Sequence, residues 1–260
     1  MSYAFNWGLP PTAASFAPEI DSGIALIHWA MLIIFVLWGA FFTYLLIRYR
    51  HRADVGVSLE DTTHSLKSLV PDVIVMIFEI GLIIFYAIPV WAHIKMKFPG
   101  GNEDPVELNV IAQQFAWNVQ YPGPDGKFGR RKPELINFYN PIGLDLTDPA
   151  AQDDVVLANE IHLPAGTKAL IHLSTLDVIH SFGVPEFRLK QDAVPGMEIP
   201  VWVKPTQAGT YELACAQLCG FAHSLMTGVV VVQSPDQYQA WLKSRAPAKP
   251  QQAAAPGANF

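Results

Sequence analysis

The chain has 260 residues, a formal net charge of −6 at pH 7 and a hydrophobic share of 51%, which gives a mean hydropathy of +0.23. This acidic balance excludes the class of strongly basic proteins that bind the phosphates of nucleic acids. With two cysteines in the whole chain, a small scaffold held by several disulfides is excluded as well. The length predicts one compact domain with appendages.

Two apolar stretches account for the high hydropathy. Residues 24–47 contain no formal charge, and residues 73–92 are interrupted only by Glu79, a glycine and a proline. Each stretch has roughly the 20 residues that a helix needs to cross the hydrocarbon core of a bilayer. Because this is long for a buried core helix, we predict a two-helix transmembrane hairpin within residues 24–97.

Lysine and arginine are distributed unevenly around the first stretch. Residues 1–23, the predicted outer segment, contain neither, whereas the loop between the stretches carries Arg48, Arg50, Arg52 and Lys67. The positive-inside rule therefore predicts a loop in the cytoplasm or mitochondrial matrix, with both ends of the chain outside. The first residues also lack the basic start of a signal peptide, so we expect the first span to insert without cleavage.

Glu79 lies within the second predicted span. A carboxylate at this depth costs about 2.5–3.5 kcal/mol on insertion scales and usually faces protein or water rather than lipid. Two interpretations stay open: a proton-handling group, or a neutral acid that is hydrogen-bonded to a neighbouring helix. In either case we expect it to face another subunit rather than lipid.

Beyond residue 97 the pattern changes to short strands separated by glycine and proline. Alternating segments occur at residues 107–112, 156–163, 168–173, 199–203, 210–214 and 228–232. Such spacing predicts an antiparallel sandwich or barrel over residues 98–243. His162 and His172 fall in these strands, where hydrogen-bonded structural imidazoles are commoner than metal ligands.

Several segments lie outside these strands. Residues 122–154, rich in proline, glycine and aspartate, predict a long insertion loop. Taken alone, residues 189–196 read as a charged turn. Residues 234–243 predict a short closing helix with Ser234 as a cap, and the Ala/Pro-rich residues 244–260 predict a disordered tail.

The residues with the strongest chemical signal are Cys215, Cys219, His223 and Met226, which fall within twelve positions. A further imidazole is offered by His180, in the run His-Ser-Phe-Gly-Val-Pro. Thiolate and thioether groups select copper(I), and imidazole binds copper in either oxidation state. Two cysteines four residues apart can bridge two metals. The alternatives are a disulfide between these cysteines and a structural zinc site, although zinc rarely takes methionine.

The pattern C-x3-C-x3-H-x2-M with an upstream H-S-F-x-V-P resembles the dinuclear copper A site of cytochrome c oxidase subunit II. This resemblance extends over roughly residues 20–243 and implies an all-β Greek-key cupredoxin-like barrel with the copper loop between its last two strands. It also implies a ligand set: bridging thiolates from Cys215 and Cys219, imidazoles from His180 and His223, an axial thioether from Met226, and the backbone carbonyl of Gln217.

The chain departs from this family at three positions. Gln217 stands where a glutamate often helps to hold magnesium, and a neutral amide is a poorer ligand for that ion, so magnesium stays an open question. His64 stands where many members have a glutamate at the mouth of a proton channel. Phe115 stands where an exposed tryptophan usually accepts electrons, and Trp117 matches a second tryptophan that is better suited to packing.

The resemblance implies an electron-transfer subunit of a respiratory haem-copper oxidase, in a bacterial cytoplasmic or mitochondrial inner membrane, with its copper domain outside. It would take electrons from a cytochrome c-type donor and pass them to haem in subunit I, where oxygen is reduced. No C-x-x-C-H haem motif occurs, so we expect the donor to be another polypeptide, such as a dedicated haem c protein. The alternatives are a membrane-anchored copper-delivery or storage protein and a quinol-oxidising relative, a branch that lacks the copper cysteines.

Overall fold

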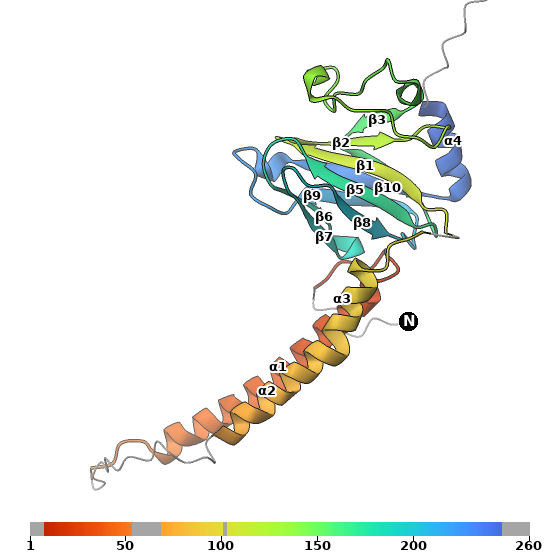
Figure 1. Ribbon diagram of the computed structural model, residues 1–260. Coiled ribbons are helices and arrows are strands. Elements are labelled where there is room, and N and C mark those ends of the chain that lie inside the picture. The colour runs from red at the N-terminus through yellow and green to blue at the C-terminus, as the bar shows by residue number, and fades with distance from the viewer. Residues whose placement is uncertain (1–7, 54–68, 101–102, 246–260) are drawn as a thin grey trace, which may run out of the picture. The chain divides into compact units, whose positions relative to one another are not determined.

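Two long apolar helices precede a β-sandwich in the computed structural model, which describes residues 8–53, 69–100 and 103–245 (Figure 1). The chain divides into two units. One consists of Met1–Leu9 and Pro18–Lys97, and the other of Pro10–Ala17 and Phe98–Phe260.

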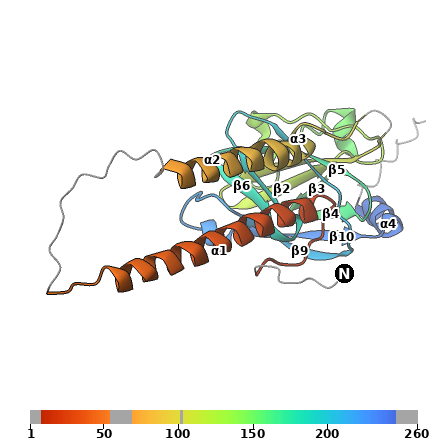
Figure 2. The ribbon, with the colours of Figure 1, turned by 90° about the horizontal axis from the view of Figure 1, so that it is seen from below.

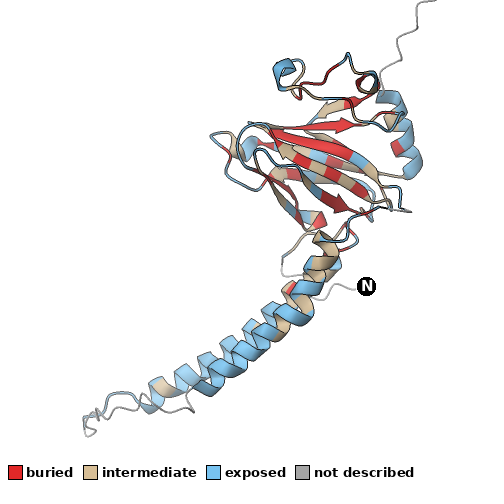
Figure 3. Ribbon diagram, viewed as in Figure 1, coloured by how far each residue is buried: buried red, intermediate tan, exposed pale blue. Residues whose placement is uncertain are grey.

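The helical unit contains α1 (Ala17–Arg48), α2 (Val70–Leu82), a π-helical turn η2 (Ile83–Ala87) and α3 (Ile88–Lys95). The stretches Ala17–Arg48 and Val70–Lys95 are both long and apolar enough to cross a membrane, and their most apolar windows are 0% buried. Figure 3 shows this exposure along most of both helices. Two apolar helices therefore lie where the sequence predicts them.

The π-helical turn ends two residues before Pro89, which lies in the first turn of α3. Proline has no N–H, and its ring would collide with the carbonyl oxygen four residues earlier in a regular α-helix. One wider turn accommodates it. In the same region Tyr86 donates a hydrogen bond of 2.6 Å to the backbone oxygen of Glu19 on α1. Gly23 lies directly against the Tyr86 ring, since a Cβ there would be 2.7 Å from the ring.

The second unit is a sandwich of two five-stranded sheets. The first sheet has the order β3 (Val155–Ala158), β2 (Ala116–Tyr121), β1 (Val106–Gln113), β5 (Ala169–Thr175), β8 (Ile199–Val203). The second has the order β4 (Glu160–Pro164), β10 (Thr227–Gln233), β9 (Gly209–Cys215), β6 (His180–Val184), β7 (Leu189–Ala193). The chain crosses repeatedly between the sheets, which gives the predicted Greek-key, cupredoxin-like fold.

Three details correct the sequence prediction. The sandwich is not purely antiparallel, because β1 pairs with β5 and β4 pairs with β10 in parallel. The single strand predicted at 156–163 is divided at Asn159, whose φ of 57° turns the chain from one sheet into the other. Asparagine tolerates this left-handed conformation better than most residues. Residues 189–193 form a strand paired with β6 instead of a charged turn.

The core lies between the sheets; β5, for example, buries every second residue, whereas β1 and β6 each bury five residues in a row. The segment before α1 also packs onto this unit. The N–H of Ala13 donates to Glu186 O at 2.8 Å, and the ring of the buried Phe16 meets Trp202 edge-on at 5.3 Å. This contact joins residues far apart in the chain and has no signal in the sequence pattern.

Residues 122–154 form the predicted insertion, with two short 3₁₀ turns at Pro133–Leu135 and Pro149–Gln152. A helix, α4 (Pro235–Arg245), follows the last strand beside β4 and β10 (Figure 2). The hydroxyl of Ser234 accepts a hydrogen bond from the N–H of Gln237, as expected for a cap. The predicted tail lies almost wholly outside the described residues.

The insertion is held by a buried carboxylate, Asp145. It pairs with Lys132 at 2.8 Å and with Arg130 at 3.2 Å, and it accepts a hydrogen bond from the Thr147 hydroxyl at 2.6 Å. The hydrogen bonds from Lys132 and Thr147 hold the pKa of Asp145 well below its usual range. The carboxylate is therefore ionised throughout the pH range in which trypsin acts.

We expect Asp145→Ala to expose the insertion to trypsin at Arg130 and Arg131, because Arg130 and Lys132 lose the charge that ties down this loop. Limited proteolysis of the full-length chain with mass spectrometry would measure the cleavage rate at these sites. Glu134→Ala removes an exposed carboxylate from the same loop and should leave that rate unchanged. Equal rates in both variants would contradict an anchoring role for Asp145.

Candidate metal centre

Strand register brings four loops to one end of the sandwich. Leu173 pairs with Ile199, His180 with Ala193, Gln113 with Ala116 and Ala214 with Thr227. The four loops therefore begin or end together: residues 114–115, 176–179, 194–198 and 216–226. The last of these is closed at its base, because the N–H of Cys215 donates to Met226 O at 3.1 Å.

All six predicted donor groups lie at this end. His180, Cys215 and Cys219 offer ligand atoms that all lie within 4.8 Å of one another. The neighbouring atom pairs are Cys215 Sγ and Cys219 Sγ at 3.8 Å, Cys219 Sγ and His223 Nδ1 at 3.6 Å, His180 Nδ1 and Met226 Sδ at 3.1 Å, and Cys215 Sγ and Gln217 O at 3.1 Å. Both cysteines are free thiols.

The His180 ring is oriented by Asp177. Its Nε2–H donates to Asp177 Oδ1 at 2.8 Å, which directs the lone pair of Nδ1 toward the sulfur atoms. Burial would raise the pKa of Asp177, but hydrogen bonds from His180 and from the N–H groups of Gln114 and Val178 outweigh it, so the pKa is lowered. Asp177 is therefore a fixed negative partner for the imidazole.

Most of the donors are withdrawn from solvent. His180 is 0% exposed, Met226 1%, Cys219 4% and Cys215 8%. Burial, together with the hydrogen bond and charge of Cys215, raises the pKa of the Cys219 thiol to about 11. In the absence of metal this thiol is therefore protonated at neutral pH, and metal binding must release its proton.

The chemistry of this donor set fits copper. Two thiols, two imidazoles, a thioether and one carbonyl oxygen are soft or borderline ligands, whereas magnesium and calcium require mostly oxygen. The two sulfurs are near enough to each other to be shared by two ions. An imidazole nitrogen lies near each sulfur, His180 Nδ1 at 3.9 Å from Cys215 Sγ and His223 Nδ1 at 3.6 Å from Cys219 Sγ. Gln217 contributes only its backbone oxygen to the cluster, and as a residue it is exposed.

The two aromatic residues predicted for electron transfer lie at different depths. Phe115 is half-buried in the β1–β2 turn, and its ring meets Phe221 edge-on at 5.1 Å. Phe221, in the loop between Cys219 and His223, is 96% exposed. Trp117 is fully buried behind His180, with ring centroids 6.2 Å apart, which is the packing position that the sequence comparison favours for it.

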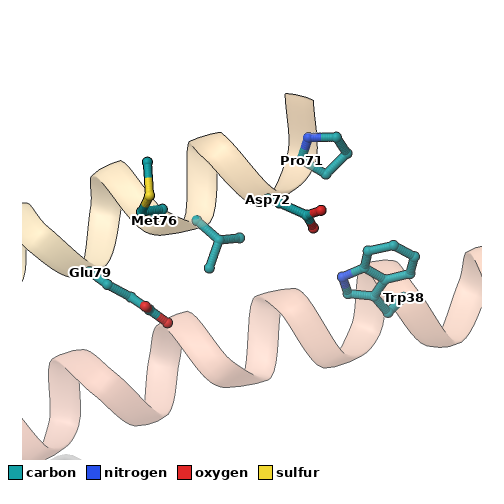
Figure 4. Close-up of a pocket in the computed structure, with 6 residues that line it drawn as sticks. Trp38, Pro71, Asp72, Met76 and Glu79 are labelled. Atoms are coloured by element: carbon teal, nitrogen blue, oxygen red, sulfur yellow. The ribbon is translucent and has the colours of Figure 1, made fainter. Parts of the chain in front are cut away.

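Of the other predicted residues, Glu79 belongs to the helical unit, and His162 and His172 belong to strands of the sandwich. Glu79 lines a cavity of about 290 Å³ between α1 and α2 with Trp38, Pro71, Asp72 and Met76, and its carboxylate points toward α1 (Figure 4). His64 lies outside the described residues. His162 contacts Glu160 at 2.6 Å and Gln233 at 3.0 Å, and His172 contacts Glu107 and Glu198, so both imidazoles have polar partners, as predicted.

Sequence reasoning did not identify Asp177 or Gln114 as part of this region. Asp177 lies three residues before His180, a spacing that could have drawn attention to it. Gln114 stands next to Phe115 in the aromatic run, but its contact with Cys219 spans 105 residues and has no sequence signal.

Gly220 has a φ of 141°, and a Cβ there would lie 2.9 Å from both Gln114 Nε2 and Phe115 Cζ. We therefore expect Gly220→Ala to strain the loop next to Cys219 and to weaken copper binding by roughly tenfold or more. Titration against a chelator of known copper affinity would measure this.

Gly196→Ala is the matched control, because that glycine also has a positive φ, 76°, but has no atom within 4 Å of a built Cβ. Affinities that match in the two variants would show that the crowding at Gly220 has no effect on the site.

The family model described as "Cytochrome C oxidase subunit II, periplasmic domain" matches residues 106–234. The "Alternative cytochrome c oxidase subunit 2" of Bradyrhizobium diazoefficiens is 32% identical over 244 residues, which are 92% of this chain and 84% of that protein. The subunit 2 of Thermostichus vulcanus is 45% identical over 141 residues, covering 54% of this chain and 34% of that protein.

Among solved structures, the periplasmic domain of subunit II (CoxB) of Bradyrhizobium japonicum matches with a TM-score of 0.42 and 24% identity, covering 57% of this chain and 96% of that domain. The two subunit 2 relatives and the matched family model together cover both the helical region and the sandwich. The chain belongs to the cytochrome c oxidase subunit II family.

Proposed function

We propose that this chain is the electron-receiving subunit of a haem-copper oxidase, with a dinuclear copper A centre held by His180, Cys215, Gln217, Cys219, His223 and Met226. The observation that carries the proposal is the convergence of these six donors at one end of the sandwich, around two sulfurs 3.8 Å apart. Copper bound there would supply one-electron redox chemistry.

The residues around the donors suit a relay. The strands fix Cys215 and His180, while Asp177 holds the His180 ring in one tautomer and one orientation. Trp117 fills the space behind that ring and keeps water from it. Ligands that are already in place reorganise little when the charge of the site changes, and low reorganisation favours rapid electron transfer.

Burial separates this function from its main alternative. A copper-delivery or storage protein must hand over its ion and needs accessible ligands. Here the thiols, one imidazole and the thioether are each at least 92% buried. A site closed in this way favours a resident metal over an exchanging one.

The surface of the site end supports contacts with partner proteins. Exposed apolar side chains surround the donors: Leu176, Val178, Ile179, Leu218, Phe221 and Leu225. Apolar patches of this kind mark protein interfaces. We assign this face to subunit I and to a cytochrome c-type donor, with Phe115 in the electron path in place of the usual tryptophan.

The charge of the domain bears on the donor. Residues 98–260 carry 11 Lys and Arg against 16 Asp and Glu, a balance of −5. Long-range attraction would steer a basic haem protein toward this surface. The smaller ring of Phe115 suits a dedicated haem c donor in the same assembly, because tethering raises its effective concentration.

The helical unit completes the proposal. α1 and α2–α3 would anchor the chain in a bacterial cytoplasmic or mitochondrial inner membrane, with the basic loop inside and the sandwich outside. Glu79 shares its cavity with Asp72, which is compatible with a proton-handling group, and His64 is the second candidate for that role. Oxygen reduction itself is assigned to subunit I.

The full-length chain, purified in detergent and loaded with copper, should bind two copper ions per chain. Its electron paramagnetic resonance spectrum should show one unpaired electron shared equally between two copper nuclei. Cys219→Ser should hold at most one copper, with a spectrum from a localised electron, because one bridging sulfur is lost. A single copper or a four-line spectrum from the unaltered chain would contradict the proposal.

A further inference from the structure

Gln114 contacts both of the chain segments that supply the donor groups. It lies in the two-residue turn between β1 and β2, on the sheet opposite the one that carries Cys215 and His180. Its backbone N–H donates to Asp177 Oδ2 at 2.7 Å, and its side-chain Nε2 donates to the backbone oxygen of Cys219 at 2.7 Å.

The first of these bonds acts on the His180 side of the site. Asp177 uses one carboxylate oxygen for Gln114 and the other for His180 Nε2. The turn therefore holds the Asp177 carboxylate, and that carboxylate in turn holds the His180 ring, whose Nδ1 faces the sulfur atoms.

The second bond acts on the Cys219 side. In the described residues, the Cys219 carbonyl belongs to the irregular loop 216–226 and lies outside any strand, so no ladder hydrogen bond fixes it. The Gln114 amide supplies such a bond from the turn between β1 and β2. A Cβ on Gly220 would approach the same Nε2 to 2.9 Å, so the turn and the loop fit closely at the peptide between Cys219 and Gly220.

We propose that Gln114 is a positioning residue of the metal centre: its side-chain amide fixes the Cys219 peptide so that the Cys219 sulfur faces Cys215 and His180. This inference rests on the proposed function, since it concerns how the copper pair is held. Residues that orient metal ligands through hydrogen bonds typically alter metal affinity by about 10- to 100-fold when they are removed.

Two variants test the side-chain bond. Gln114→Ala removes the amide but keeps the backbone N–H to Asp177, so only the Cys219 side loses its support. Gln114→Glu keeps the size of the side chain but replaces the amide N–H donor with a carboxylate oxygen. An ionised carboxylate cannot donate a hydrogen bond to the Cys219 carbonyl oxygen. Gln113→Ala, at the end of β1, removes the same type of side chain one position away and is the control.

The measurements use the full-length chain loaded with copper in detergent. We expect both Gln114 variants to lose copper to a chelator roughly tenfold faster than the unaltered chain. We also expect changed copper hyperfine splitting and a changed visible spectrum, and Gln113→Ala should match the unaltered chain. A residue that served folding alone would lower the thermal stability of the copper-free chain and leave these spectra unchanged.

A second readout separates positioning from partner contact. If Gln114 only touched the electron donor, both variants assembled in the oxidase would raise KM for cytochrome c, with the copper spectra and chelator kinetics unaltered. That result would overturn this inference alone. So would Gln114 variants whose copper spectra and chelator kinetics match those of the unaltered chain, provided that the unaltered chain binds two coppers. An unaltered chain that binds no copper pair would overturn the proposed function, and this inference with it.

Discussion

The hydrogen bond from the N–H of Cys215 to Met226 O closes the loop on which the rest of the site depends. It fixes the two ends of residues 215–226 at the point where β9 passes into β10. Cys215 also pairs with Phe182 on β6, two residues from His180. Backbone pairing between β6 and β9 thus sets the distance between one sulfur and one imidazole before any metal is bound. The remaining donors all lie in the loop of residues 216–226.

Burial of the donors has two consequences that act in opposite directions. It raises the pKa of the Cys219 thiol and so makes the metal-free site resist ionisation. It also excludes water from the sulfurs and imidazole, which stabilises the site once a metal has replaced the protons. The same enclosure leaves an apolar rim, with Phe221 as its most exposed residue, as the surface that a partner can reach.

Much of this arrangement could be predicted from the sequence, because ligand spacing and apolar runs are local signals. The two apolar helices, six strand segments, the insertion and the donors within residues 215–226 all required only short windows, whereas the role of His180, 35 residues before Cys215, came from the family resemblance. Other features depend on contacts between distant parts of the chain: the parallel pairing of β1 with β5, the packing of Phe16 on Trp202, and the bond from Gln114 to Cys219. The turn at Asn159 was missed because alternation continues across it, although the chain changes sheets there.

The most direct measurement is anomalous diffraction at the copper edge from crystals of the copper-loaded chain. Two separate peaks should lie between the sulfurs of Cys215 and Cys219, one beside Nδ1 of His180 and the other beside Nδ1 of His223. A single peak, or copper bound away from these sulfurs, would contradict the assignment of a dinuclear centre to this loop.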